Sequence, residues 1–375
     1  MALQCGIIGL PNAGKSTIFN ALTASQVPAE SYPFCTIDPN VGVVAVPDER
    51  LEQLARIYQP GKVTPATVEF VDIAGLVRGA SKGEGLGNQF LAHIREVDAL
   101  IHVVRCFEDP DISHVEGRLD PVRDAGIVET ELLLKDLETV EHRLARVKKP
   151  AATGDSEARE ELAALEKVRQ ELNEGRLACT IGLPDEELAL IRPLFLLTLK
   201  PILYVANVGE EELGLEQPRR SLHGESRSPQ VQALFDFAAR ENNRAIRLCG
   251  QLEQEIALLE ESEREAFVEE YHLREAGLAK LIHAAYDLLD YQTFFTCNPN
   301  EARAWTFHRG ATAWDAAGMV HTDFQRGFIK AEVFPYDELL RLGSEKALKE
   351  AGLAGLEGKD YRVRDGDVIY FKFSV

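Results

Sequence analysis

The chain has 375 residues, of which 45% are hydrophobic and 27% are charged, and its formal net charge is −20. This composition is typical of a globular protein and excludes a disordered, collagen-like or disulfide-bonded scaffold. The length suggests about two or three domains. The acidic balance argues against a protein that coats nucleic acid with its whole surface, but it permits a single basic patch.

The sequence predicts a cytoplasmic protein with no membrane partner. The N-terminal apolar stretch lacks a basic leader and runs into a glycine-rich motif, which indicates a strand and not a signal peptide. The most apolar stretch, residues 191–208, is interrupted by Arg192, Pro193, Lys200 and Pro201, so it is not a membrane span. The cysteines show no CxxC spacing, which indicates reduced cytosolic thiols, with a redox-sensing thiol as the alternative.

Apolar runs that predict strands recur along the chain, with helical patterns between several of them. They cover residues 3–8, 41–46, 68–71, 99–106, 202–206 and 245–249. Alternating strands and helices favour an α/β fold with a mostly parallel sheet.

Residues 9–17 read GLPNAGKST and fit the P-loop pattern GxxxxGK[ST], between an apolar strand and a helix that starts near Ser16. Gly9 and Gly14 allow a tight turn whose N–H groups face a phosphate. We expect Lys15 to reach the β- and γ-phosphates and the Ser16 hydroxyl to ligate Mg²⁺. The predicted phosphate-binding residues are Asn12, Ala13, Gly14, Lys15, Ser16 and Thr17. The alternative is a purely structural strand–turn–helix.

A second phosphate-site element follows the strand at residues 68–71, where residues 72–75 read DIAG. We expect Asp72 to hold the Mg²⁺ hydration shell and Gly75 to offer its N–H to the γ-phosphate. Thr36, in the preceding loop, is the candidate for completing the metal shell, with Ser31 as a rival. The glycines that follow indicate a switch segment that orders around the γ-phosphate; they are Gly79, Gly83, Gly85 and Gly87.

Two amphipathic patterns separate the fourth and fifth predicted strands. Apolar residues at 133, 137, 140, 144 and 147 form one stripe, and those at 162, 165, 168 and 172 form another, with a break at residues 150–154. This predicts an antiparallel helical hairpin, and the alternative is two helices that lie flat on the domain. Basic residues gather at the predicted tip with no acid among residues 142–149; they are His142, Arg143, Arg146, Lys148 and Lys149.

The remaining segments differ in composition. Residues 216–230 predict a loop and residues 251–275 an acidic helical region. From about residue 291 the pattern predicts a separate small α+β domain, with strands at residues 332–334 and 368–373. Asp365-Gly366 predicts a turn between residues 361–364 and 367–373.

Four segments are similar to one family: GLPNAGKST, the run from Asp72 to Leu91, RCFED at residues 105–109 and ANVGE at residues 206–210. Over nearly its whole length the chain resembles the YchF family, the Obg-like ATPases of the translation-factor GTPase class. The resemblance implies an α/β P-loop NTPase G-domain fold with an inserted antiparallel helical hairpin and a C-terminal α+β, β-grasp-like TGS domain. It implies a nucleotide-binding domain at residues 1–124 and 194–285, the insertion at 125–193 and the TGS domain at 290–375.

The resemblance also implies ATP as the nucleotide. GTPases of this class read guanine with NKxD, whereas the matching residues here are Asn207, Val208, Gly209 and Glu210. A Glu one methylene longer than Asp loses the paired fit to guanine, while Asn207 can serve adenine and Val208 and Phe107 can pack on the ring. A GTPase translation factor is the alternative, because Glu210 could still reach guanine.

For hydrolysis, the residue after Gly75 is Leu76, which cannot orient water as the Gln of Ras-like proteins does. Hydrolysis is therefore expected to be slow. The resemblance implies that His114 takes the water-positioning role, with a surface-loop histidine as the alternative. Asn12 matches an asparagine that binds K⁺ in some related GTPases, which makes K⁺ a further candidate cofactor beside Mg²⁺.

The expected partner is the ribosome, through the hairpin tip and the TGS domain, and no DNA partner is expected. Aromatic and basic residues of the final domain could stack on bases or fill its core; they are Trp305, Phe307, His308, Arg309 and Trp314. The predicted function is a slow, Mg²⁺-dependent ATP switch that associates with the ribosome. A non-catalytic ATP-dependent binding module in stress regulation is the remaining alternative.

Overall fold

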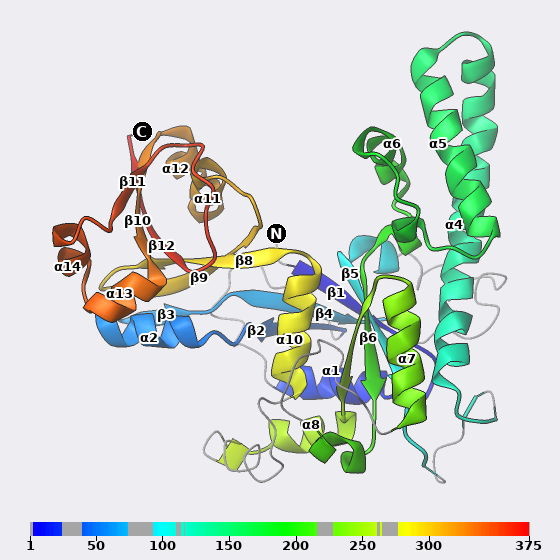
Figure 1. The fold of residues 1–375 in the computed structure, drawn as a ribbon, viewed down its shortest axis with the longest axis horizontal. Coiled ribbons are helices and arrows are strands. Elements are labelled where there is room, and N and C mark those ends of the chain that lie inside the picture. The colour runs from blue at the N-terminus through cyan, green and yellow to red at the C-terminus, as the bar shows by residue number, and fades with distance from the viewer. Residues whose placement is uncertain are drawn as a thin grey trace.

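The structure, a computed structural model, describes residues 3–24, 40–73, 93–109, 114–115, 117–215, 228–260, 263–264 and 277–374. The described residues form two six-stranded sheets, and a long pair of helices projects away from both (Figure 1). We call the first the central sheet and the second the C-terminal sheet.

The central sheet has the strand order β2-β4-β1-β5-β6-β7. All neighbouring strands are parallel except β2, which pairs antiparallel with β4. Its strands are β1 (Leu3–Ile8), β2 (Val41–Ala45), β4 (Thr67–Asp72), β5 (Ala99–Arg105), β6 (Ile202–Asn207) and β7 (Arg244–Leu248). The predicted α/β fold with a mostly parallel sheet is therefore confirmed.

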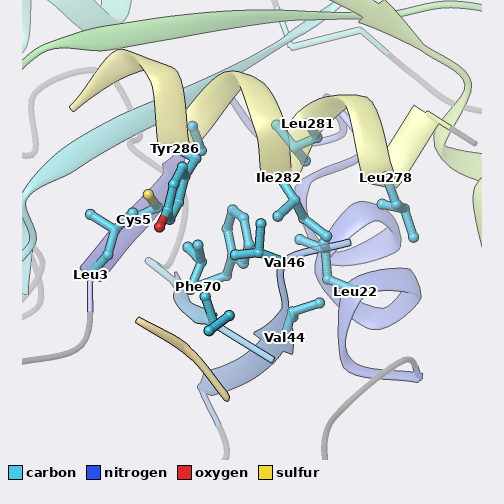
Figure 2. Packing of buried hydrophobic residues seen from close by; sticks show 14 of the residues in the cluster. Leu3, Cys5, Leu22, Val44, Val46, Phe70, Leu278, Leu281, Ile282 and Tyr286 are labelled. Carbon is cyan, nitrogen blue, oxygen red and sulfur yellow. The ribbon is translucent and has the colours of Figure 1, made fainter. Parts of the chain in front are cut away.

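Helices cover both faces of the central sheet, and for this reason its strands read as continuous apolar runs. Every residue of β5 and β6 is buried. On one face lie α1 (Lys15–Ala24) and α10 (Gly277–Leu288), and Figure 2 shows Ile282 and Tyr286 of α10 above Phe70 and Val46. On the other face lie α4 (Pro121–Ala152) and α7 (Pro229–Arg240). The helix α8 (Gly250–Ala257) follows β7.

The C-terminal sheet has the order β11-β10-β12-β8-β9-β3. Its strands are β8 (Tyr291–Cys297), β9 (Glu301–His308), β10 (Phe328–Pro335), β11 (Gly355–Glu357), β12 (Asp367–Phe373) and β3 (Lys62–Thr64). The helices of this region are α11 (Ala313–Val320), α12 (Thr322–Arg326), α13 (Tyr336–Leu342) and α14 (Glu345–Glu350). The expected small α+β arrangement is present.

The predicted turn at Asp365-Gly366 is confirmed: the N–H of Asp367 donates to the carbonyl oxygen of Arg364 at 3.2 Å, and Gly366 has a φ of +89°. The turn does not join two paired strands. Residues 361–364 form no strand, and of them Arg362 makes only an isolated bridge to Thr312. The strand β12 instead lies between β10 and β8, antiparallel to the first and parallel to the second. Because both of its edges are taken, β12 has no free edge to offer to the segment that precedes it.

The C-terminal sheet is not built from the final residues alone. β3 lies between β2 and β4 in the chain, yet it pairs with β9 as an edge strand. The helix before it, α2 (Glu49–Tyr58), also faces this sheet: Arg50 Nη1 donates to Asp365 Oδ2 at 2.8 Å, and the Tyr58 hydroxyl donates to Glu345 at 2.8 Å. Buried residues of both sheets form one continuous core.

The predicted helical hairpin is confirmed. The helices α4 and α5 (Ser156–Asn173) pack along their length and project from the central sheet (Figure 1). Val140 and Leu144 of α4 are buried in one cluster with Leu165 and Val168 of α5. The predicted break at residues 150–154 is confirmed, because α4 ends at Ala152 and α5 begins at Ser156. Pro150 lies in the last turn of α4, where its ring costs only one backbone hydrogen bond.

The hairpin tip carries charges of both signs, which corrects the expectation of a purely basic tip. Arg146, Lys148 and Lys149 are exposed, but Arg143 forms an ion pair with Glu161 at 2.6 Å. The turn also brings in the acidic start of α5, where Asp155 caps the helix. Basic residues favour the end of a helix and acidic residues favour its beginning, so an antiparallel turn brings the two groups together.

Short helices connect α5 to β6 and follow β6. They are η3 (Ala178–Thr180), α6 (Asp185–Ile191), η4 (Arg192–Leu194), η5 (Leu197–Leu199) and η6 (Glu210–Leu215). The buried carboxylate of Asp136 on α4 accepts the N–H groups of Leu197 and Thr198, each at 2.8 Å. This contact anchors the base of the hairpin to the central domain. The predicted loop at residues 216–230 ends before Pro229, where α7 begins, and residues 216–227 are outside the described part.

Aromatic residues of the C-terminal sheet divide between core and surface. Phe307 is buried, and Trp305 packs against the same cluster, with its Nε1 donating to Thr296. Trp314 is 44% exposed, and Arg309 pairs with Asp290 on the surface. The core therefore takes only part of the predicted aromatic group.

The described part of the chain contains no disulfide and no helix that is long and apolar enough to cross a membrane. Its cysteines are free thiols, of which Cys179 is exposed and the others are buried. Cys35 lies outside the described residues.

Two buried carboxylates meet at the base of α4. The Tyr204 hydroxyl of β6 donates to Glu129 of α4, and it lies 3.3 Å from Glu241, which follows α7. Burial and the neighbouring Glu241 raise the pKa of Glu129 to about 8, and burial also raises the pKa of Glu241. Hydrogen bonds to Tyr204 and Glu129 and the charge of Arg240 oppose this rise in the pKa of Glu241. The thiol of Cys179 also lies near both carboxylates.

The free energy of unfolding is expected to fall as the pH rises from about 5 to about 8, because folded Glu129 keeps its proton over this range. Above the usual Glu pKa the unfolded chain releases a proton that folded Glu129 keeps until about pH 8, so unfolding becomes more favourable across that window. Glu129→Gln removes this dependence, and the difference in unfolding free energy between the variant and the wild type is expected to move in favour of the variant by roughly 3 kcal/mol between about pH 5 and pH 8. Urea unfolding at both pH values measures it. Glu141→Gln, an exposed position on the same helix, is the matched control, and equal pH slopes for all three proteins would contradict the prediction.

Candidate functional site

The P-loop follows β1 and turns sharply into α1. Gly9 and Gly14 have φ of +148° and +94°, which glycine adopts without strain. A Cβ at Gly9 would lie 2.3 Å from the carbonyl oxygen of Val103, and one at Gly14 would lie 2.1 Å from Asn207 Nδ2. Both positions must lack a side chain so that the loop can pack against the ends of β5 and β6.

Lys15 begins α1 and is only 8% exposed. Its Nζ donates to the carbonyl oxygen of Leu10 at 2.8 Å. Burial lowers the pKa of Lys15, and the nearby carboxylate of Asp72 opposes this shift. The ammonium group and the N-terminus of α1 together create the positive field that favours a phosphate group.

Asp72 ends β4 and faces the start of α1. Ser16 Oγ donates to Asp72 Oδ2 at 3.4 Å, while Asp72 Oδ1 is buried and accepts no hydrogen bond from the residues that the structure describes. Burial raises the pKa of Asp72, and Lys15 and Ser16 oppose the shift. A hydroxyl and a carboxylate with an unused oxygen fit Mg²⁺, which takes few protein ligands and completes its shell with phosphate and water. Accordingly, the described residues contain no cluster of three or more His, Cys, Asp or Glu that could hold a metal alone.

A cleft opens beside the P-loop at the carboxyl edge of the central sheet, where open α/β sheets bind ligands. The P-loop forms one end, and the segments after β5, β6 and β7 form the other. Its lining residues are Asn12, Gly14, Lys15, Ser16, Thr17, Phe107, Glu108, Asp109, Asn207, Val208, Gly209, Glu210, Glu211, Cys249, Gln251 and Gln254. Most predicted phosphate-binding and base-binding residues therefore share one cleft.

Asn207 uses its side chain within the protein. Its Nδ2 donates to the carbonyl oxygen of Ala13 at 2.9 Å, and its Oδ1 accepts the N–H of Gly250 at 2.9 Å. The residue is 4% exposed. The sequence pattern assigns Asn207 to the base, but in the structure its amide joins the P-loop to the start of α8.

The cleft is acidic at the end away from the P-loop. Glu108 and Asp109 after β5 face it from one side, and Glu210 and Glu211 face it from η6. Carboxylates accept hydrogen bonds and donate none when ionised. This end of the cleft therefore suits exocyclic amino groups and ribose hydroxyls, while negatively charged phosphate groups are favoured only at the Lys15 end.

Two family models match the sequence: one described as a 50S ribosome-binding GTPase over residues 4–140, and YchF-GTPase_C, described as a protein of unknown function, over residues 291–374. The proteins named ribosome-binding ATPase YchF in Haemophilus influenzae and Bacillus subtilis are 48% and 49% identical to this chain over 375 residues, all of each chain. The chain belongs to the YchF family. The resemblance found in the sequence is thereby confirmed.

The YchF fold is also shared. The solved structure of the Schizosaccharomyces pombe YchF GTPase matches with a TM-score of 0.87 and 36% identity, covering 99% of this chain and 97% of that one. The predicted fold class, a P-loop G domain with a YchF C-terminal region, is therefore confirmed.

His114 lies outside the main cleft of this YchF protein. It lines a small neighbouring pocket behind the P-loop, which also includes Leu10, Ala13 and Arg105. Its Nε2 lies 2.7 Å from Asp124 Oδ2, and Asp124 is a buried residue in the first turn of α4. Ala13, another predicted phosphate-site residue, faces the same small pocket.

Some predicted site residues lie outside the described part of the chain. They are Thr36, Gly75, Leu76 and the switch glycines at 79, 83, 85 and 87. Their predicted roles in the metal and γ-phosphate site stay predictions.

Seven lining residues were not predicted as site residues. Four flank predicted ones, namely Glu108, Asp109, Gly209 and Glu211, and three follow β7, namely Cys249, Gln251 and Gln254. Burial raises the pKa of the Cys249 thiol. The residues after β7 could have been predicted from their position, because the carboxyl ends of parallel strands meet at one edge of a sheet. The segments after β1, β5 and β6 at that edge were already predicted to bind the nucleotide.

Proposed function

We propose that this protein binds ATP with Mg²⁺ in the P-loop cleft and hydrolyses it slowly, and that the bound nucleotide sets its affinity for the ribosome. The observation that carries the proposal is the grouping of Lys15, Ser16 and Asp72 at one end of a cleft whose other end suits a base and ribose. The relatives in Haemophilus influenzae and Bacillus subtilis are named ribosome-binding ATPases, which supports both parts. Ribosome association in turn implies a cytoplasmic location.

In this proposal the phosphate end works by charge and position. Lys15 holds the β- and γ-phosphates, and the backbone of residues 12–17 surrounds them. Ser16 and Asp72 hold Mg²⁺, with Thr36 as a further oxygen ligand and Gly75 as a donor to the γ-phosphate. The metal supplies neutralisation of the negative charge that grows on the phosphate oxygens. A K⁺ ion beside Asn12 belongs to the same proposal, and equal rates in Na⁺ and K⁺ would exclude it.

At the base end, Val208 and Phe107 pack on adenine, and the carboxylates of the acidic rim accept its 6-amino group. GTP is the second candidate, because Glu210 lines the cleft where a carboxylate could still accept hydrogen bonds from guanine. The Schizosaccharomyces pombe relative is named a YchF GTPase, which favours the same candidate.

We assign His114 to orienting the attacking water, since Leu76 has no polar atom. Asp124 fixes the imidazole through Nε2. We divide the chain into a nucleotide-binding part (residues 1–124 and 194–285), the hairpin (125–193) and a TGS-like part (290–375). Helix α4 continues without interruption across the boundary between residues 124 and 125. Asp124, which contacts His114, therefore lies on the same helix as the first half of the hairpin.

The decisive experiment measures binding and turnover of ATP and GTP side by side, with and without ribosomes. We expect tighter binding of ATP, slow release of phosphate that depends on Mg²⁺, and co-sedimentation with ribosomes that depends on the nucleotide. Preference for GTP would favour the second candidate. If phosphate release stays at background in K⁺ and with ribosomes present, hydrolysis is excluded and the protein is a non-catalytic ATP-binding module.

The hairpin's part is tested by reversing the charges of Arg146, Lys148 and Lys149 to Glu. Ribosome affinity is expected to fall about tenfold or more, because contacts to phosphates act through charge and weaken with salt. The matched control reverses the exposed Arg192, Arg240 and Arg244, which changes the net charge equally but on elements other than α4 and α5. Equal sedimentation of both variants with ribosomes would contradict a contact at the tip.

A further inference from the structure

Arg105 connects the nucleotide cleft to the sheet that supports it. It is the last residue of β5, is 6% exposed and pairs in register with Asn207 of β6. The next residue, Cys106, donates its N–H to the carbonyl oxygen of Asn207 at 2.8 Å. The backbone at Arg105 is therefore held firmly, and only beyond it does the chain turn into the cleft wall.

The guanidinium group of Arg105 contacts this wall through two hydrogen bonds and one aromatic ring. Nε donates to the carbonyl oxygen of Phe107 at 3.1 Å, and Nη2 donates to that of Asp109 at 3.4 Å. The guanidinium carbon lies 4.7 Å from the centre of the Phe107 ring. These three contacts from one planar group set both the backbone of residues 107–109 and the position of the Phe107 side chain.

Arg105 acts on this loop from behind. It is not among the described residues that line the cleft, whereas Phe107, Glu108 and Asp109 all are. It lines instead the small pocket behind the P-loop, beside Leu10 and Ala13. The structure therefore supports an indirect role, in which the guanidinium group contacts the loop and not the nucleotide.

We propose that Arg105 is a positioning residue for the nucleobase: it holds the Phe107 ring and the loop at residues 107–109 in the orientation that receives the base. The inference rests on the proposed function, in which the base packs on Phe107. Arginine suits this role because a planar guanidinium can donate in two directions while it lies against a ring. Lysine, with one compact charge, cannot do both.

The test compares Arg105→Gln with the wild type for two probes: ATP, and inorganic tripolyphosphate, which has no base. The dissociation constant of ATP is expected to rise about tenfold, because a base contact is lost, while that of tripolyphosphate changes less than about twofold. Arg240→Gln is the matched control, since Arg240 also lies over a phenylalanine ring, Phe237, at 5.9 Å on α7, away from the cleft. It is expected to bind both probes like the wild type.

Two further variants separate positioning from general damage. If Arg105 acts through Phe107, the double variant Arg105→Gln/Phe107→Ala binds ATP no more weakly than Phe107→Ala alone. Arg105→Lys is expected to resemble Arg105→Gln. Equal weakening of both probes, additive losses in the double variant, or full recovery with lysine would each overturn the inference. Wild-type protein that binds tripolyphosphate but not ATP would instead overturn the proposed function.

Discussion

Replacing Lys15 with alanine is expected to weaken ATP binding about 100-fold, or roughly 3 kcal/mol, and to reduce hydrolysis to background. Of the described residues that line the cleft, Lys15 is the only Lys or Arg. The opposite end carries four carboxylates, so no other side chain there can offset the charge of a triphosphate. Isothermal titration with ATP and Mg²⁺ measures the loss.

The same change should leave the nucleotide-free fold intact. Burial lowers the pKa of Lys15, which means that the charged form is disfavoured in the folded state and contributes little to stability without a ligand. The free energy of unfolding of Lys15→Ala is therefore expected to stay within about 1 kcal/mol of the wild type. Lys200→Ala is the control: Lys200 is also partly buried and donates to the carbonyl oxygens of Arg95 and Val97, so its loss should affect stability and not ATP affinity. Normal ATP affinity in Lys15→Ala would exclude the P-loop cleft as the nucleotide site.

Replacing Asn207 with alanine is expected to damage the site as a whole and not its choice of base. The change leaves the N–H of Gly250 and the carbonyl of Ala13 without their partners inside the protein, which costs about 2–4 kcal/mol of unfolding free energy. Because the P-loop loses its support, ATP, GTP and tripolyphosphate should all bind more weakly by a similar factor. Thermal unfolding and parallel titrations of the three ligands measure both effects.

A residue that reads the base would behave differently. Its removal would change the ratio of ATP to GTP affinity and would spare tripolyphosphate, and that outcome would contradict the supporting role inferred for Asn207. Asn207→Asp keeps an acceptor for the Gly250 N–H but replaces the donor to Ala13 with a buried carboxylate, so it is expected to weaken all three ligands at least as much as Asn207→Ala. Together with the Arg105 variants, these titrations separate support of the phosphate end from support of the base end.

Local sequence was sufficient for the features that depend on short-range geometry. The P-loop was predictable because Gly9 and Gly14 are spaced as a phosphate-binding turn requires, and their positive φ values agree with that prediction. The strands were predictable because a parallel sheet covered on both faces needs continuous apolar runs, as β5 and β6 have. The hairpin was predictable because its apolar stripes repeat at helical spacing.

Sequence reasoning failed where one segment meets another that is distant in the chain. No pattern indicates that β3 joins β9, because a three-residue edge strand has too few positions to show a period. The basic tip was overestimated because the acids of α5 become its neighbours only after the chain turns back. Thr36 and Gly75 lie outside the described residues, so their roles are still predictions.

The sequence by itself therefore determined the fold class, the family, the P-loop motif and the absence of the guanine-reading NKxD motif, since each depends on short runs of consecutive residues. The tertiary structure alone decided what the polar side chains at the sheet edge do. Asn207 could read a base or hold the loop, and the choice depends on whether Ala13 and Gly250 lie within hydrogen-bond distance of its amide. Hydrogen bonds need their partners within about 3 Å, and only the folded chain sets distances of that kind between residues so far apart in sequence.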